Sequence, residues 1–80
     1  MIRLTLHAQE WIARRGLDVR WVEATVLQPD YSLPNPADPA LTRSWRSIPE
    51  FGGRMLRVVH RPDGGDVVVI TAYFDRGAKR

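Results

Sequence analysis

The sequence predicts an α+β fold in which two N-terminal helices pack on an antiparallel sheet of three to four strands. Two segments near the start, residues 6–15 and 19–27, space apolar residues three and four apart, as amphipathic helices do. The second half is rich in β-branched residues and glycine-containing turns, which is typical of strands over residues 42–48, 54–61 and 66–74. A length of 80 residues allows one small domain, residues 1–80.

Both predicted helices have start and stop signals. Thr5 and Asp18 are suitable N-caps, because their side-chain oxygens can accept hydrogen bonds from amides of the first turn. Gly16 fits the left-handed position that ends the first helix, and Pro29 prevents the second from continuing. The face residues are Ala8, Trp11, Ile12 and Arg15 in the first helix and Val19, Val22 and Val26 in the second.

Residues 28–40 are expected to form a loop, because four prolines interrupt them and they have no periodic apolar face. Such a loop, about 13 residues long, is either a plain connector or a segment ordered by a partner. Turn residues at 50–53 and 62–65 then join the three strands into a meander.

Strand alternation assigns side chains to two faces of the sheet. In the second strand, one side carries Leu56, Val58 and His60, and the other carries Met55, Arg57, Val59 and Arg61. In the third strand, one side carries Val68, Ile70, Ala72 and Phe74. The other side carries Val67, Val69, Thr71 and Tyr73. The wholly apolar set is expected to face the helices. An open face with Arg57, Arg61, Thr71 and Tyr73 remains.

The composition argues against several classes of protein. Without cysteine, the chain has no disulfide framework and no thiolate metal site. No apolar run approaches the roughly 20 residues that span a bilayer, and the start lacks the apolar region of a signal peptide. P-loop, dinucleotide-binding and zinc-protease motifs are missing. We therefore expect a cytoplasmic protein that uses neither a metal nor a cofactor.

The positive charge is concentrated at the centre of the chain. Residues 43–61 contain five arginines and one acid, Glu50, in a chain of net charge +3. Arginine outnumbers lysine eleven to one, and guanidinium grips phosphate oxygens with two donors. Genomic base composition explains that ratio equally well, but it does not explain the clustering. We expect RNA contacts from Arg43, Trp45, Arg46 and Arg61, with core packing as the alternative role of the tryptophan.

Several side chains suit metal-free RNA cleavage. His7 falls in the first turn of the first helix, where the helix N-terminus disfavours a positive imidazole and leaves a neutral base. Tyr73 can donate a proton, Thr71 shares its face, and Arg54 and Arg57 can stabilise a pentacoordinate phosphorus. The alternative is that the histidine is a surface or capping residue. His60 is a weaker candidate because its parity places it among core residues.

The order of motifs along nearly the whole chain resembles a small bacterial family, the domain of unknown function 4258 family. The matching segments are His7-Ala8, Arg15-Gly16-Leu17, Val22, Pro29-Asp30, Gly53-Arg54, Leu56-Arg57-Val58-Val59 and Val69-Ile70-Thr71-Ala72-Tyr73. The family typically reads HAxxRMxxRGI near its start, and Trp11 here replaces the first arginine of that motif. Any role of that arginine would then fall to Arg14 or Arg15, or the activity would be impaired.

That family is similar to the barnase, EndoU and RelE group of small ribonuclease-like folds, often toxins of toxin–antitoxin pairs. The resemblance implies a site formed by His7, Arg15, Arg54, Arg57, Thr71 and Tyr73, and a cognate antitoxin as partner. The leading hypothesis is therefore a metal-independent endoribonuclease toxin. One alternative is a non-catalytic nucleic-acid-binding module. The other is a protein-interaction domain whose arginines meet an acidic partner.

Overall fold

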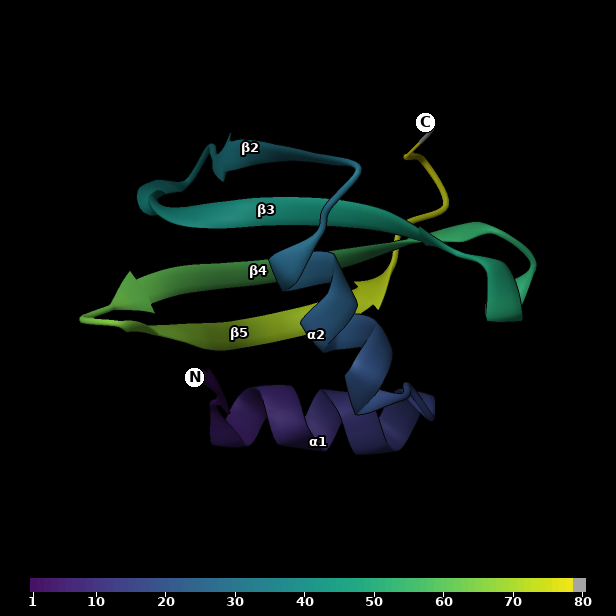
Figure 1. The fold of residues 1–80 in the computed structure, drawn as a ribbon, viewed down its shortest axis with the longest axis horizontal. Helices are drawn as coiled ribbons and strands as arrows, with labels where there is room; N and C mark the ends of the chain where they lie inside the picture. The colour runs from purple at the N-terminus through teal and green to yellow at the C-terminus, as the bar shows by residue number, and fades with distance from the viewer. Residues whose placement is uncertain (79–80) are drawn as a thin grey trace.

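Five strands form one mixed sheet in the order β1-β5-β4-β3-β2, with two helices against it, in the computed structural model, which describes residues 1–78 (Figure 1). The elements in chain order are β1 (Ile2–Leu4), α1 (Leu6–Arg15), α2 (Val19–Leu27), β2 (Tyr31–Asn35), β3 (Asp38–Ile48), a 3₁₀ turn (Pro49–Phe51), β4 (Arg54–Asp63) and β5 (Asp66–Phe74). The α+β class is confirmed. No helix within residues 1–78 is long and apolar enough to cross a membrane.

The strand count and the purely antiparallel arrangement were predicted wrongly. Strands β2 to β5 are an antiparallel meander, but β1 adds to the far edge in parallel with β5, pairing Ile2 with Val67 and Leu4 with Val69. Three residues are too few to show a strand pattern in the sequence. Ion pairs from Arg3 to Asp63 and Asp66 hold this short strand against the β4–β5 turn.

The proline-rich segment is not a loop throughout, because β2 and the start of β3 lie in it. Tyr31 pairs with Trp45 and Pro34 with Thr42, and the register shifts after Pro34. Strand β2 is the outermost strand, where a proline does not have to donate to a further neighbour. Edge pairing is therefore compatible with a composition that predicted a connector.

Both helices have the predicted bounds. The Thr5 hydroxyl accepts a 3.0 Å hydrogen bond from the Ala8 amide, and Asp18 accepts one of 2.9 Å from the Arg20 amide. Gly16 ends α1 with a φ of 65°. Helix α1 lies along the β5 side of the sheet, and α2 crosses β4 and β3 (Figure 1).

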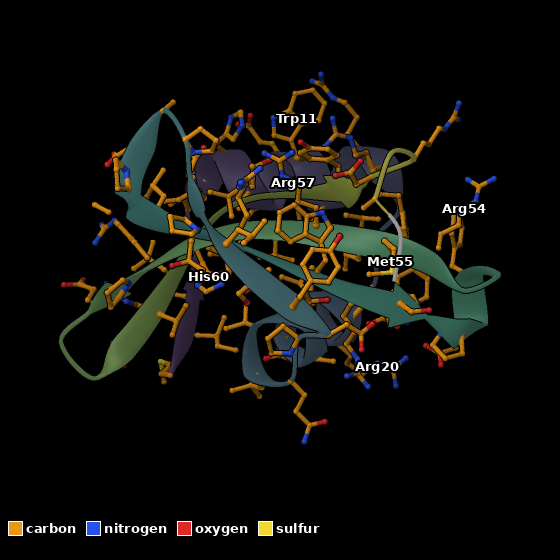
Figure 2. The ribbon with its side chains drawn as sticks, turned by 90° about the horizontal axis from the view of Figure 1, so that it is seen from above. Trp11, Arg20, Arg54, Met55, Arg57 and His60 are labelled. Atoms are coloured by element: carbon orange, nitrogen blue, oxygen red, sulfur yellow. The ribbon has the colours of Figure 1, made fainter. Side chains whose placement is uncertain are left out.

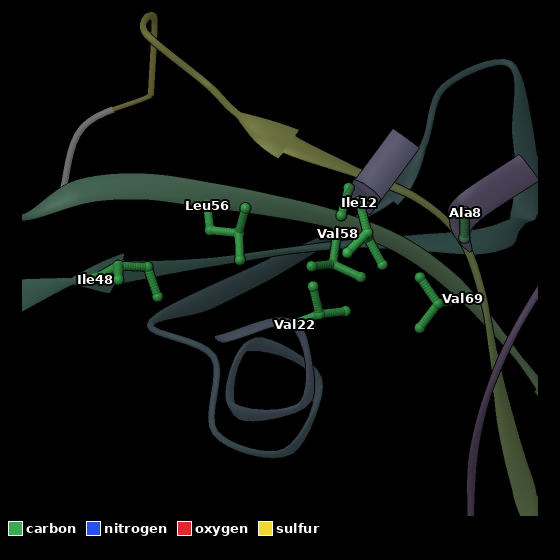
Figure 3. Close-up of a cluster of buried hydrophobic side chains, with 8 residues drawn as sticks. Ala8, Ile12, Val22, Ile48, Leu56, Val58 and Val69 are labelled. Atoms are coloured by element: carbon green, nitrogen blue, oxygen red, sulfur yellow. The ribbon is translucent and has the colours of Figure 1, made fainter. Parts of the chain in front are cut away.

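The hydrophobic core lies between the helices and one face of the sheet (Figure 3). Its buried members are Ala8, Ile12, Val22, Ile48, Leu56, Val58, Val69 and Ala72. Three rings close the end of the core: Phe51 stacks on Phe74 with centroids 4.4 Å apart, and Trp21 meets both at about 6 Å. Within residues 1–78, no helix packs on the other face of the sheet (Figure 1).

The predicted alternation holds in β4 but is wrong in the first half of β5. Val59 pairs with Thr71 and His60 pairs with Val69, so Ile70 is an extra residue between two pairs. A bulge of this kind reverses which face of the sheet the side chains of the preceding residues point to. Val69 therefore joins the core, whereas Val68 pairs with Arg61 on the helix-free face.

Candidate functional site

A row of paired residues crosses the helix-free face of the sheet. Its four members, neighbours on β2, β3, β4 and β5, are Tyr31, Trp45, Arg57 and Tyr73. The Tyr31 and Trp45 rings are stacked with their centroids 4.7 Å apart. The guanidinium carbon of Arg57 lies 5.8 Å from the Trp45 ring centroid and 5.1 Å from that of Tyr73. The arginine thus stands between two rings at distances where cations are attracted to ring faces.

Helix α1 extends this row beyond β5. The guanidinium carbon of Arg15 lies 5.4 Å from the Tyr73 ring centroid and 4.0 Å from that of Trp11. Its Nη1 donates a 3.0 Å hydrogen bond to the Ala72 carbonyl, which fixes the side chain over β5. We call the whole set the arginine–aromatic row; its members are Trp11, Arg15, Tyr73, Arg57, Trp45 and Tyr31.

Three further side chains flank the arginine–aromatic row. Arg14 lies 5.2 Å from the Trp11 ring centroid, and Arg43 lies 5.1 Å from that of Trp45. The exposed His7 ring meets Trp11 edge-on, with centroids 5.7 Å apart. His7, Trp11 and Arg15 follow one another at intervals of four residues, so they share one face of α1. His7, a candidate base, is therefore separated from the arginines only by the Trp11 ring.

Asp75 is the carboxylate that holds the row in place. Its Oδ2 accepts a 3.1 Å hydrogen bond from Trp45 Nε1 and lies 3.9 Å from Arg57 Nη1. Arg57 is only 23% exposed at its side chain, and its buried Nε has no hydrogen-bond partner within residues 1–78. An unpaired buried donor is costly in a folded protein, and such a group needs an explanation.

The structure brings together some of the predicted site residues. Arg15, Arg57 and Tyr73 are in contact, and His7 adjoins them through Trp11. Thr71 lies on the same face of β5 as Tyr73, paired with Val59.

Arg54 lies outside this group. Its guanidinium carbon is 5.5 Å from the Phe51 ring centroid, at the end of β4 away from Arg57 (Figure 2). Residues three apart on a strand point to opposite faces, so Arg54 and Arg57 cannot share one phosphate.

The predicted RNA-contact residues are also divided between the two faces. Arg43 and Arg61 lie on the helix-free face, across from Val59 and Val68. Arg46 pairs with Leu56 on the helix side, donates a 2.6 Å hydrogen bond to the Gln28 carbonyl and lines a groove beside α2. Trp45 is 4% exposed beneath Tyr31, so its ring has no free face for a base. Core packing, the alternative role, fits its position.

His60 lies on the helix side of the sheet, away from the row. Its Nε2 shares a 2.8 Å hydrogen bond with the Ser44 hydroxyl, which shares another of 2.8 Å with Ser32. Burial lowers the pKa of His60 from its ordinary value of 6.5. Burial therefore favours the neutral form of this histidine, and its Nε2 is hydrogen-bonded. No three His, Cys, Asp or Glu side chains among residues 1–78 are grouped as a metal site requires.

Sequence reasoning missed three residues of the site. Asp75 was detectable, because it follows Tyr73 by two residues and so continues the same face. Trp11 was also detectable, because it lies midway between His7 and Arg15 on one face of the helix. Tyr31 gave no signal, because its strand lies in the proline-rich segment.

The model of one protein family matches the chain over residues 4–74, and its description is Domain of unknown function (DUF4258). The chain belongs to this family. The matched residues include both helices and strands β2 to β5, so the match covers the whole arginine–aromatic row. No curated protein and no solved structure matches the chain.

Proposed function

We propose that the protein is a metal-independent endoribonuclease that cleaves RNA at the arginine–aromatic row. The observation that carries this proposal is the alternation of guanidinium groups with rings across an open face, ending at His7. A guanidinium held between rings keeps its N–H edge available for phosphate oxygens. The row therefore presents donors to a polyanion without having to order them at the moment of binding.

Arg57 is the strongest single argument for a phosphate ligand. Its position is fixed by the rings of Trp45 and Tyr73 and by the carboxylate of Asp75, yet its Nε is unpaired. The ion pair at 3.9 Å is too long for a strong hydrogen bond, so the guanidinium retains binding capacity. Because Nε is buried, a phosphate in front of Arg57 would accept hydrogen bonds from its Nη groups.

The proposed reaction uses groups of this chain alone. His7 accepts the proton of the ribose 2′-OH, and the 2′-oxygen attacks the adjacent phosphorus. Arg15 and Arg57 stabilise the added negative charge of the phosphorane. The Tyr73 hydroxyl donates a proton to the departing 5′-oxygen as the P–O5′ bond breaks. The products are a 2′,3′-cyclic phosphate and a 5′-hydroxyl end.

The likeness to the barnase, EndoU and RelE group belongs to the same proposal, as do a cytoplasmic location and a toxin role. A cognate antitoxin would neutralise the protein by covering the helix-free face with acidic or helical segments. The charge of that face supports an acidic partner, because Arg14, Arg15, Arg43 and Arg57 all lie along it.

A specific observation favours a second function, binding of single-stranded RNA without cleavage. The family arginine expected at position 11 is Trp11, and its ring lies under the guanidinium of Arg15. A ring at this position adds to binding by stacking but supplies no charge for a phosphorane. Under this alternative, RNA affinity depends on salt and the RNA stays intact.

The test is incubation of the purified protein with an unstructured RNA in excess EDTA, followed by analysis of the fragment ends. We expect 2′,3′-cyclic phosphate ends and a rate that falls about 100-fold or more in His7→Gln, because general bases contribute at least that much. His7 is exposed, so this variant should fold normally. Arg20→Gln, on α2, is the matched control and should cleave at the wild-type rate. Intact RNA with a folded protein would favour the binding module.

A further inference from the structure

A cavity of about 430 Å³ opens where β4 begins and β5 ends. Its lining includes two apolar residues, Met55 from β4 and Phe74 from β5. Arg54 and Arg76 supply positive charge to the wall, and Asp75 supplies a carboxylate. This volume lies in the range of small-molecule sites, which combine apolar walls with a few polar groups.

The two arginines of the cavity are available to a ligand. Within residues 1–78, neither the Arg54 nor the Arg76 side chain makes a hydrogen bond or an ion pair, and the described contact of Arg54 is with the Phe51 ring. By contrast, Arg3 and Arg20 are both paired with carboxylates. Two guanidinium groups without a partner among residues 1–78, at a cavity that apolar residues also line, suit a ligand with an apolar part and an anionic part.

The cavity and the arginine–aromatic row meet at Asp75. This carboxylate lines the cavity, and its Oδ2 is in contact with Trp45 and Arg57 of the row. Arg54 and Arg57 are three residues apart on β4, which places their Cα atoms roughly 10 Å apart. Met55 lies between them along the same strand, as Figure 2 shows. A chain-like ligand held at Arg57 would therefore reach the cavity without leaving the protein surface.

We infer that this cavity is a nucleotide subsite, which holds one base beside Met55 and its phosphate between Arg54 and Arg76. The inference rests on the proposed function and deepens it, because it names the substrate as single-stranded RNA. A base must leave the stack of a duplex before it can enter a cavity, and unstacking costs least in a single strand. Under this inference, Arg54 and Arg57 are far apart because they bind different nucleotides of one RNA strand.

The test is titration of the ¹⁵N-labelled protein with the four nucleoside monophosphates, with inorganic phosphate as the second ligand, followed by amide chemical shifts. We expect monophosphates to shift the signals of Gly53, Arg54 and residues 74–78 before those of Trp11 and Arg15. Arg54→Gln and Arg76→Gln should each weaken this binding about tenfold, the effect of losing one hydrogen bond to a charged group. Arg20→Gln should leave it unchanged.

The outcomes separate the subsite from the proposed function. If monophosphates shift the signals of the row and not those of the cavity, the subsite is refuted and the ribonuclease proposal is unaffected. The same conclusion follows if phosphate alone binds the cavity as tightly as the monophosphates do. If monophosphates bind the cavity but RNA is never cleaved, the subsite stands and the cleavage proposal fails. In cleavage assays, we expect Arg54→Gln to raise KM about tenfold with kcat unchanged.

Discussion

Substitution of Arg57 by methionine separates a binding role from a structural one. Methionine has a similar length, no charge and a sulfur that packs well against rings such as Trp45 and Tyr73. The change removes a buried Nε that has no partner, an arrangement that costs about 1–3 kcal/mol. It also removes two cation–ring contacts, which contribute about 0.5–1 kcal/mol each. These effects oppose each other, so we expect a change in the free energy of unfolding between a loss of about 1 kcal/mol and a gain of about 2 kcal/mol.

RNA binding should respond to the same substitution strongly. If Arg14, Arg15, Arg43 and Arg57 each contact one phosphate, the logarithm of affinity should fall with the logarithm of salt with a slope of about −2.8. That slope corresponds to a loss of about 50-fold between 50 and 200 mM salt. Three contacts give a slope of about −2.1 and a loss of about 20-fold, which is the expectation for Arg57→Met.

The assays are urea unfolding for stability and fluorescence anisotropy for binding. A single-stranded 2′-O-methyl RNA is the ligand, because it lacks the hydroxyl that attacks phosphorus and stays intact. Arg20→Met removes the same charge from α2 and should keep the steeper slope. An unchanged slope in Arg57→Met would show that this arginine touches no phosphate. If the unfolding free energy fell by about 3 kcal/mol or more, the unpaired Nε would not destabilise the fold as we describe.

Three further predictions concern the fold. Thr5→Ala should lower the unfolding free energy by about 1 kcal/mol, because α1 loses its N-cap; urea unfolding measures this, and Thr5→Ser should restore most of it. Leu56→Ala should cost about 2–5 kcal/mol, because the side chain is fully buried in the core, and an unchanged urea midpoint would contradict that packing. His60→Gln should flatten the pH dependence of stability. The folded pKa of His60 lies below 6.5, so the unfolded state binds more protons as the pH falls through 6.5 and the wild type loses stability there. Urea midpoints at pH 7.5 and 5.5 check this, and equal slopes in wild type and variant would refute it.

The parts of the fold that depend on neighbouring residues in the chain were predictable. Thr5, Gly16 and Asp18 act within one helical turn, so both helices were bounded correctly. Strands β1 and β2 were not predictable, because their pairing is decided by partners far along the chain. The bulge at Ile70 has no signal in the residue types around it, and parity reasoning failed there.

In the candidate site, too, local strand alternation placed residues on the correct face, whereas it could not place residues that depend on tertiary contacts. Arg57 and Tyr73 were assigned to one face because β4 and β5 alternate regularly between residues 55 and 59 and between 71 and 74. The resemblance supplied Arg15, which reaches β5 only through the docking of α1. Arg54 was grouped with Arg57 by charge and by the resemblance, and strand geometry separates the two. The catalytic roles of these residues stay predictions until cleavage is measured.

The parallel pairing of β1 with β5 also determines how late in synthesis the sheet can close. Ile2–Leu4 pairs with Val67–Val69, so β1 cannot pair until β5 has been synthesised. Helix α1 depends on the same late strand, since Thr5 and Arg15 both hydrogen-bond to carbonyls of β5. Contacts so distant in sequence form slowly. During synthesis, the partial chain therefore has neither a closed core nor an assembled arginine–aromatic row. The complete row forms only after β5 has left the ribosome.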